Sequence, residues 1–493
     1  MASERPNLLY IMSDQHTQRV TGCYADRIVQ TPFLDHLARR GVVFENAYTA
    51  SPLCLPARMS ALTACYPVNQ ACWTNSDVLA SDRPTMAHAL GAAGYQPILI
   101  GRLHAIGPDQ LHGFVRQEVG DHSTNWVGGR RHDMGALDKT NDPFRVSLRK
   151  SGAGQSAYEL HDVDVTRSAC AVLEEIAGRR RAGDRGPFCL SIGYMLPHQP
   201  YVAGREEYNL YLGKVGPPEL PAPDPGSEHP YLRWWREYTD TQSVTTQETI
   251  RARTAYYGLA TRLDALIGRA LDTLDRLDLA ENTLVVYTSD HGDQIGERGL
   301  WWKQTFYDES TKVPLILSWP GRLPEAERRV QVVGLTDLTQ TILEAAGAPA
   351  LPNADGHSFL AVARDDNHPW IDETFSEYCT DAMESWAGIV PVQQRMIRTR
   401  RWKLNYYHGH PPQLFDMTQD PRETKDLAGE PPFASIRDAL QARVLAEWDP
   451  GAIAQQMMRR RHDKELLAAW CRTVNPPEVY RWRLCMEDNW LSE

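Results

Sequence analysis

Five short apolar runs recur along the chain without strict polar alternation, as expected of strands that are covered on both faces. They span residues 7–13, 96–100, 187–194, 283–289 and 313–318. Between these runs, apolar residues recur at helical spacing, and several of the helical segments stop at a glycine. These segments span residues 31–40, 85–93, 163–177, 254–277 and 335–346. The alternation predicts an α/β fold with a large, mostly parallel sheet and helices on both of its faces.

Two polar stretches interrupt this alternation: residues 117–155, which are rich in glycine, and residues 213–230, which are rich in proline. Both predict long surface insertions, and such loops often shape the mouth of a pocket. After about Thr374 the pattern changes, and residues 398–407 predict an exposed antiparallel strand. We therefore expect a catalytic α/β domain over residues 1–373, a smaller α+β subdomain over 374–447 and a C-terminal extension over 448–493.

The C-terminal extension is rich in arginine and tryptophan, notably in residues 457–461 and 480–484. One interpretation is a solvated helix with an irregular end. The interpretation that we favour is a contact with another subunit, because the tryptophans need burial. We accordingly expect a homo-oligomer, either a dimer or a tetramer.

Composition and charge narrow the classes of partner and compartment. The chain has 493 residues and a formal net charge of −11, which argues against nucleic acid or an anionic membrane as the main partner. A locally positive pocket for a small anionic substrate remains compatible with this charge. The nine cysteines show no CxxC pair and no zinc spacing, so we expect reduced thiols in a cytoplasmic protein. Residues 1–6 leave no room for a signal peptide, and no apolar run reaches the ~20 residues of a membrane span.

The ends of the predicted strands carry the candidate chemistry, because ligands of open α/β sheets bind beyond the carboxyl ends of the strands. A single polar residue in such a place is usually part of a turn. Here ionisable or amide side chains follow four of the five strands, which predicts a site. They are Asp14, Gln15, Arg102, His104, His198, Asp290 and His291.

Four of these residues, Asp14, Gln15, Asp290 and His291, predict a cation site. Two carboxylates and an amide oxygen suit a hard divalent ion such as calcium. If His291 also ligates, the site suits manganese or another ion that accepts nitrogen. The alternative is that Gln15 and His291 are ordinary hydrogen-bonding residues.

The segment 51–58 is the most specific feature of the chain. Cys54, Pro56 and Arg58 match a Cys-x-Pro-x-Arg signature, and here the chain resembles the type I sulfatases of the alkaline phosphatase superfamily. Further segments resemble that family in the same order: residues 31–46, 60–63, 289–292, Lys303, 313–314 and 414–427. The resemblance covers most of residues 7–430. It implies an alkaline phosphatase-like fold and the hydrolysis of small alkyl or aryl sulfate monoesters.

The resemblance also implies a modified residue. In this family a formylglycine-generating enzyme oxidises the cysteine to formylglycine, so Cys54 would be both nucleophile and ion ligand. Pro56 suits the first turn of a predicted helix over 57–63, and Cys54 then lies at a helix N-terminus, which favours an anion. The hydrated aldehyde offers two hydroxyls: one ligates the cation and attacks sulfur, and the other collapses to the aldehyde and expels sulfate.

Matching positions imply roles for the remaining residues. Arg58 resembles the arginine that supports formylglycine and the ion, and Lys303 resembles the lysine that binds sulfate oxygens and protonates the leaving oxygen. His198 resembles the leaving-group acid. His104 resembles the histidine that assists collapse of the hydrate.

Two further positions imply contacts with the substrate. Asn75 resembles a pocket amide of the family. Arg102 stands where the family has a lysine, and a planar guanidinium is not a neutral replacement for an ammonium group. Whether Arg102 takes the role of that lysine is left open by the sequence.

The leaving group is only weakly indicated. Residues 107–114 and the C-terminal extension resemble choline sulfatase, but residues 120–129 depart from that pattern. Choline would require an aromatic cage, to which Trp126, Trp301 and Trp302 are candidates unless they serve in packing. Two alternatives remain: a phosphonate monoester or phosphodiester hydrolase of the same superfamily, and an inactive binding protein with unconverted Cys54.

Overall fold

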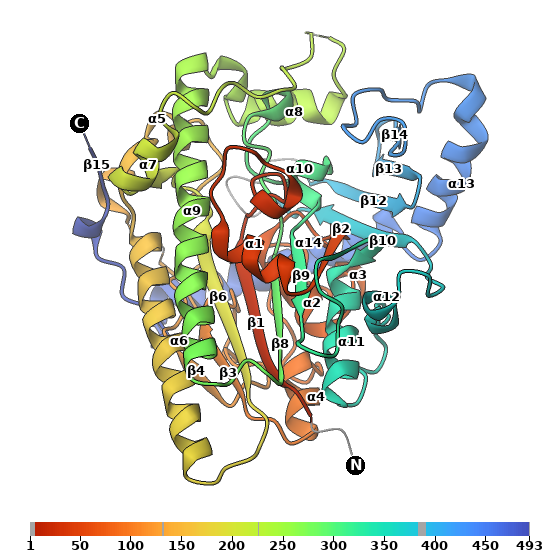
Figure 1. Ribbon diagram of the computed structural model, residues 1–493. Coiled ribbons are helices and arrows are strands. Elements are labelled where there is room, and N and C mark those ends of the chain that lie inside the picture. Colours follow the sequence, from red (N-terminus) through yellow and green to blue (C-terminus); the bar gives the residue numbers. More distant parts are fainter. Residues whose placement is uncertain (1–4, 131–132, 225, 383–390, 493) are drawn as a thin grey trace.

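The computed structural model describes residues 5–492 apart from 131–132, 225 and 383–390. Its centre is an eight-stranded sheet (Figure 1). The strands are β1 (Asn7–Asp14), β2 (Val42–Tyr48), β3 (Pro97–Gly101), β4 (Arg116–Glu118), β6 (Cys189–Pro197), β8 (Thr283–Ser289), β9 (Leu315–Ser318) and β10 (Glu327–Gly334). Their order is β10-β2-β9-β8-β1-β6-β3-β4, and only β9 runs antiparallel to its neighbours. The predicted mostly parallel sheet is confirmed.

Helices cover both faces of this sheet (Figure 1). On one face lie α1 (Pro32–Arg39), α6 (Ala157–Arg181) and α9 (Thr246–Arg276), and on the other lie α2 (Cys54–Thr63), α4 (Met86–Ala92) and α11 (Leu335–Ala346). Along β1, Leu9 and Ile11 pack into the first core, whereas Leu8 and Met12 pack into the second. Because both faces are buried, the strands lack polar alternation.

The bounds of the elements follow the predicted pattern with instructive exceptions. β8 and α11 have the predicted bounds, whereas α6 and α9 begin six and eight residues earlier than predicted, at Ala157 and Thr246. Their N-caps explain this, because Ser156 and Thr245 accept hydrogen bonds from the backbone of Glu159 and Glu248. Strands β2 and β10 were not predicted, since charged and polar residues break their apolar runs.

A second, antiparallel sheet forms the predicted C-terminal subdomain. Its strands run in the order β11 (Glu373–Cys379), β12 (Gln393–Thr399), β13 (Trp402–Tyr407) and β14 (Gln413–Asp416), with α13 (Ala434–Leu445) packed beside them. The prediction of one exposed strand over 398–407 is wrong. A turn after Thr399 divides that segment between β12 and β13, and most of β13 is buried. Lys403 and Tyr407 face the catalytic half, whereas Leu404 packs within the subdomain. The division at residues 373 and 447 stays a prediction.

The remaining elements are short, with one exception in the C-terminal extension. They are α3 (Pro67–Gln70), α5 (Val146–Arg149), α7 (Arg205–Tyr211), α8 (Pro230–Tyr238), α10 (Asp308–Thr311) and α12 (Leu360–Arg364). The exception is α14 (Pro450–Val474), which is followed by irregular chain and then β15 (Trp490–Leu491). A small sheet joins β15 to β5 (Gly152–Gln155) and β7 (Val202–Ala203), so the end of the chain returns to the catalytic half.

The two predicted insertions differ in character. The segment 117–155 contains short elements, among them α5 and β5, whereas the described part of 213–229 is loop. The subunit contact predicted for the extension stays a prediction. Within the part of the chain that the structure describes, no helix is both long and apolar enough to cross a membrane.

Candidate active site

The sheet brings two distant acids to one point. β1 and β8 are parallel neighbours with Ser13 opposite Ser289. Asp14 and Asp290, the next residue of each chain segment, therefore lie side by side at the same edge of the sheet. Both carboxyl groups are fully buried. The backbone N–H of Gln15 donates to Oδ1 of Asp290 over 3.0 Å, which ties the two strand ends together. The predicted convergence of these strand ends is therefore present.

Cys54 approaches the same point from the second face of the sheet. Helix α2 begins at Cys54 itself, three residues earlier than predicted, with Leu53 as its N-cap. Pro56 lies in the first turn, where its missing N–H costs no hydrogen bond. The backbone N–H of Leu55 donates to Oδ1 of Asn75 over 3.0 Å. The Cys54 side chain therefore lies at a helix N-terminus that a neighbouring loop helps to cap.

A cluster of possible metal ligands results from this convergence. One ligand atom each from Asp14, Cys54, Asp290 and His291 lies within 4.8 Å of all the others, and all four residues are buried. Sγ of Cys54 lies 3.3 Å from Nε2 of His291 and 3.7 Å from Oδ1 of Asp14. Two carboxylates, one imidazole and a neutral or oxidised Cys54 side chain form a donor set that fits one divalent cation.

Gln15 lies at the rim of this cluster. Its amide oxygen accepts a hydrogen bond from Nζ of Lys303 over 2.6 Å, and its amide nitrogen donates to Gln199 and Asp293, each over 2.6 Å. The side chain is therefore fully hydrogen-bonded. Its role as an ion ligand stays a prediction.

Two arginines balance the negative charge of the acids. Nε and Nη2 of Arg58 lie 2.9 Å from Asp290 and 3.3 Å from Asp14, and Nε of Arg102 lies 2.5 Å from Asp14. Burial alone would raise the pKa of Asp14, but the charges of Arg102 and Arg58 hold that pKa well below its usual range. Asp14 is thus ionised and available to a cation.

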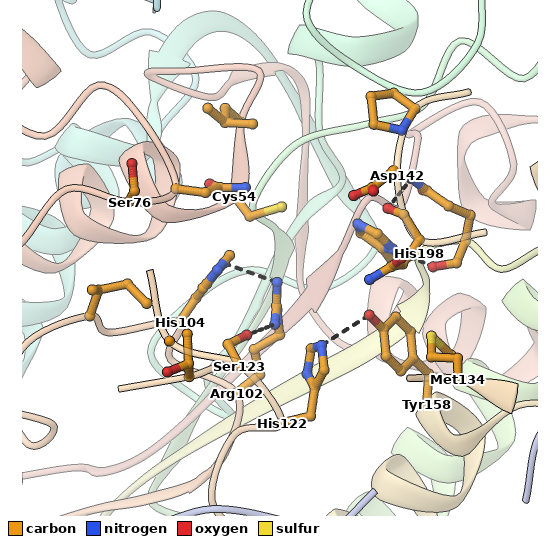
Figure 2. A pocket seen from close by; sticks show the side chains of 18 of the residues that line it. Cys54, Ser76, Arg102, His104, His122, Ser123, Met134, Asp142, Tyr158 and His198 are labelled. Carbon is orange, nitrogen blue, oxygen red and sulfur yellow. Dashed lines mark hydrogen bonds between the residues drawn. The ribbon is translucent and has the colours of Figure 1, made fainter. Parts of the chain in front are cut away.

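The pair Arg102 and His104 has a defined proton arrangement. Nη2 of Arg102 lies 3.0 Å from Nδ1 of His104 (Figure 2). A guanidinium only donates, so Nδ1 accepts and the ring hydrogen of His104 is on Nε2. Burial, followed by the charge of Arg102, lowers the pKa of His104 well below its usual value. The planar fork of Arg102 contacts Asp14, Asp121 and His104 at once, which a lysine ammonium would not reproduce.

Lys303 and His198 complete the polar surroundings of Cys54. Nζ of Lys303 lies 3.0 Å from Sγ of Cys54. Nδ1 of His198 lies 2.5 Å from the carbonyl oxygen of Gln199, which only accepts, so Nδ1 carries a hydrogen. Burial, followed by the charge of Lys303, lowers the pKa of His198. The neutral ring therefore presents an unprotonated Nε2.

A cavity of about 570 Å³ opens beside Cys54. Six of the predicted site residues line it, namely Cys54, Asn75, Arg102, His104, His198 and Lys303. Asp14 and Asp290 are buried behind the wall that contains Cys54. Of the three tryptophans considered for an aromatic cage, only Trp126 lines this cavity. Trp302 is fully buried and donates to Ser147, and Trp301 packs against Tyr201, so both serve in packing.

The outer wall of the cavity contains residues that the sequence did not indicate. His122 and Tyr158 line it (Figure 2), and Asp121 supports them from behind. His122 and Asp121 lie in the polar segment predicted to shape a pocket mouth, but no periodicity or spacing marked either of them. Tyr158 lies on α6, which was predicted to begin only at residue 163.

The backbone at the site adopts a rare conformation. Four residues other than glycine have left-handed φ values between 61° and 66°, namely Gln15, His104, Trp302 and Gln304. Such residues persist only where the surrounding structure imposes them, and they concentrate at functional sites. Two of these residues, Gln15 and His104, are predicted site residues, and the other two flank Lys303.

Comparison with known proteins decides the family. The family model described as Sulfatase matches residues 6–348, and a model described as N-sulphoglucosamine sulphohydrolase, C-terminal, matches residues 296–449. The chain belongs to the sulfatase family. The resemblance of the Cys54 segment and the alkaline phosphatase-like fold are thereby confirmed, and the protein is a sulfatase-family hydrolase.

Relatives of this sulfatase include enzymes of different stated specificity. It is 32% identical to the choline-sulfatase of Rhizobium meliloti (strain 1021), over 93% of this chain and 91% of that protein. It is 28% identical to arylsulfatase K of Homo sapiens, over 96% of this chain and 87% of that protein.

Solved structures of phosphonate monoester hydrolases share the fold of this sulfatase. The enzyme of Agrobacterium radiobacter superposes with a TM-score of 0.74 at 21% identity, covering 90% of this chain and 95% of that one. The enzyme of Silicibacter pomeroyi superposes with a TM-score of 0.71 at 26% identity, covering 93% of this chain and 96% of that one.

Proposed function

We propose that this sulfatase hydrolyses alkyl or aryl sulfate monoesters with a nucleophile formed by oxidation of Cys54 to formylglycine. The observation that carries the proposal is the position of Cys54 at a helix N-terminus, within 4 Å of Asp14, His291 and Lys303. The proposal requires a formylglycine-generating enzyme that oxidises Cys54. It also implies that the substrate is a small sulfate ester. Cytoplasmic location and a homo-oligomeric state are further proposals that rest on the sequence.

The ligand cluster supports one divalent cation, with calcium as our first choice and manganese as the alternative. Asp14, Asp290, His291 and the modified Cys54 would hold it, and Gln15 lies beside them. Such a cation supplies charge stabilisation and lowers the pKa of a bound hydroxyl group. Arg58 contacts both acids and so holds Asp14 and Asp290 in place relative to each other.

The remaining side chains suit the sulfate group and its leaving group. The ammonium of Lys303 lies against Cys54, where it can bind sulfate oxygens as they gain charge in the transition state. His198 presents Nε2 to the cavity, and the charge of a bound sulfate ester favours the protonated ring that a leaving-group acid requires. His104 presents an Nε2–H, which suits a donor to the hydrate oxygens. Asn75 and Arg102 border the same space.

A phosphonate monoester or phosphodiester hydrolase is the second candidate. The structural similarity to two phosphonate monoester hydrolases and the Asp290-His291 pair favour it. Choline is a less favoured leaving group, even though a choline-sulfatase is a relative, because the cavity has one tryptophan rather than a cage.

A substrate panel on protein with verified Cys54 chemistry tests the proposal. Intact mass of the Cys54 peptide first shows whether the thiol has become an aldehyde, and an unconverted, inactive protein would support the binding-protein alternative. We expect aryl and alkyl sulfates to be turned over faster than phenylphosphonate monoesters, phosphodiesters and choline sulfate. Chelation should abolish turnover, and Cys54→Ala should be inactive. A clear preference for phosphodiesters would overturn the sulfate assignment.

A further inference from the structure

A chain of three side chains forms the wall of the cavity opposite the ion cluster. Oδ1 of Asp121 lies 3.1 Å from Nδ1 of His122. Nε2 of His122 lies 2.9 Å from the hydroxyl of Tyr158, a contact that Figure 2 shows. The three residues come from a loop and from the first turn of α6. Tyr158 is buried except for the part that lines the cavity.

Asp121 is the fixed, ionised end of this chain. Its Oδ2 accepts the backbone N–H of His104 over 3.0 Å, and its Oδ1 lies 3.3 Å from Nη1 of Arg102. Burial alone would raise the pKa of Asp121, but Arg102 and His122 hold that pKa well below its usual range. Nδ1 of His122 lies 3.1 Å from this carboxylate, where a bare nitrogen lone pair would face a negative oxygen. The ring hydrogen of His122 is therefore placed on Nδ1.

The proton arrangement of His122 then dictates that of Tyr158. Burial lowers the pKa of His122 to about 4, so the ring is neutral near neutral pH. With its hydrogen on Nδ1, the ring has a bare Nε2 that can only accept. The hydroxyl of Tyr158 must therefore donate to Nε2, and its oxygen keeps its lone pairs for donors from the other side.

Tyr158 lies next to His198, the residue that we assign as leaving-group acid. The ring of Tyr158 contacts the ring of His198 edge to face, with 5.9 Å between centroids, and both rings line the cavity. The side chain of Asn141 also hydrogen-bonds the Tyr158 hydroxyl. The hydroxyl oxygen then has one further lone pair, and the ring that carries it packs against the residue that we assign as leaving-group acid.

We propose that Tyr158, oriented by Asp121 and His122, is a specificity-determining residue that accepts a hydrogen bond from a hydroxyl on the leaving group. The substrate class is then a sulfate ester with a second hydroxyl close to the ester oxygen. This inference rests on the proposed sulfate ester hydrolysis and deepens it. A leaving group without a donor, such as choline, leaves this acceptor unused.

Two aryl sulfates of similar shape test the inference. 2-Hydroxyphenyl sulfate carries the hydroxyl, and 2-fluorophenyl sulfate has no donor at that position. We measure kcat/KM for both substrates with the parent protein and with Tyr158→Phe. The ratio is kcat/KM for the hydroxyl substrate divided by kcat/KM for the fluoro substrate. Comparing this ratio between the two proteins cancels the different reactivity of the two leaving groups. One hydrogen bond of about 1–1.5 kcal/mol corresponds to a roughly tenfold larger loss for the hydroxyl substrate.

Variants of His122 test the orientation by the chain. His122→Gln keeps an acceptor near the position of Nε2 and should preserve the ratio, whereas His122→Leu removes it and should lower the ratio toward that of Tyr158→Phe. Tyr95→Phe is the matched control, because Tyr95 is a buried tyrosine that donates to Pro6 outside the cavity. It should leave the ratio unchanged.

The outcomes separate this inference from the proposed function. If Tyr158→Phe lowers kcat/KM equally for both substrates, the ratio is unchanged. That result would overturn the role of Tyr158, while the proposal of sulfate hydrolysis would stand. If His122→Gln and His122→Leu behave alike, orientation by the chain is wrong. If the converted parent protein hydrolyses neither sulfate, the proposed function itself fails, and no ratio is measured.

Discussion

The two walls of the cavity are held together by different means. The wall with the ion cluster consists of side chains at the ends of neighbouring parallel strands, and Asp14 and Asp290 are placed by the register of β1 and β8. The outer wall consists of loop residues that contact the C-terminal extension. Thr124 donates to Glu478 over 2.5 Å, and the backbone N–H of Trp482 donates to the carbonyl oxygen of Asp121 over 3.0 Å.

This difference teaches which functions the sheet secures and which it leaves to loops. The ion cluster needs sub-ångström placement of several charges, and a buried parallel sheet provides it because strand positions are fixed by main-chain hydrogen bonds. In our proposal the outer wall borders the leaving group, and the relatives of this chain include a choline-sulfatase and an arylsulfatase. Loops anchored by a remote segment can change there without disturbing the sheet.

The largest effect is expected from the wall with the ion cluster. Asp290→Asn removes one carboxylate from the ligand cluster and leaves Arg58 with one acid instead of two. We expect kcat/KM for aryl sulfate to fall by about 10³-fold or more, comparable to losing a main electrostatic contribution to catalysis. Bound metal measured by mass spectrometry should fall below one ion per chain.

A matched acid outside the cluster controls for this effect. Asp275→Asn changes an exposed acid that pairs with Arg40 on the surface, and it should keep both activity and metal content. Full activity of Asp290→Asn with a full complement of metal would contradict our assignment of this wall.

The second prediction concerns the attachment of the extension. Nζ of Lys464 on α14 lies 2.7 Å from Asp381 and 2.9 Å from Asp77, and all three side chains are buried. Lys464→Met removes the buried cation that Asp77 and Asp381 share, while Arg460 stays 3.7 Å from Asp77, and this should lower the free energy of unfolding by about 3 kcal/mol. Chemical denaturation measures this loss.

The comparison of the two walls predicts a second property of the same variant. Because α14 contributes nothing to the ion cluster, the folded fraction of Lys464→Met should keep its metal. Lys425→Met, which changes an exposed lysine that pairs with Glu430, should have no effect on stability. Metal loss that exceeds unfolding in Lys464→Met would show that the walls are not independent.

The sequence predicted the wall with the ion cluster far better than the outer wall, and the reason is physical. Asp14 and Asp290 follow apolar runs, and parallel strands must end at one edge of the sheet, so their convergence follows from the pattern alone. Cys54 was marked by a local signature. Besides its neighbours His122 and Ser123, Asp121 has partners at residues 102, 104 and 482, and no local rule relates these positions.

The contacts of the C-terminal extension were also only partly predictable from the sequence. Its tryptophans were expected to be buried against another subunit. In the structure Trp448 is buried within this chain, and Trp482 packs against His161 of α6 and donates to Asp164. Trp470 and Trp490 are exposed, so the predicted contact with another subunit stays a prediction. The partners of Trp448 and Trp482 within this chain were not predicted, because long-range loop contacts leave no periodic trace.

The third prediction tests the residue that joins the two walls. Arg102→Lys restores the family's residue type, yet one ammonium cannot reproduce contacts to Asp14, Asp121 and His104 together. We expect a loss of about tenfold in kcat/KM for aryl sulfate, equivalent to one lost hydrogen bond of about 1.4 kcal/mol. Steady-state kinetics on the metal-loaded protein measures it.

The same arginine-to-lysine substitution at an exposed position is the control for that variant. Arg116→Lys on β4 changes an arginine that pairs with Glu118 and Glu175 at the surface, and activity should be retained. If Arg102→Lys is as active as the parent protein, the planar fork is not what aligns Asp121 with the ion cluster.

The smallest effect is expected far from both walls, where His229 caps α8 beside the C-terminal subdomain. Its Nε2 lies 2.8 Å from the carbonyl oxygen of Pro411, and its Nδ1 accepts the backbone N–H of Tyr231 over 3.2 Å. Burial lowers the pKa of His229 to about 4. The unfolded chain, with a histidine pKa near 6.5, binds more protons between about pH 4 and 6.5, so stability rises with pH across this window and falls on acidification.

His229→Asn removes this titration while keeping a side chain that caps helices well. At neutral pH we expect little change in the free energy of unfolding. Between pH 7 and about pH 4.5 the parent should lose on the order of 1 kcal/mol more than the variant, allowing for partial solvent screening. Equal slopes of stability against pH in both proteins would show that His229 binds protons to the same extent in the folded and the unfolded chain over this window. The pH dependence of this interface would then lie in other groups.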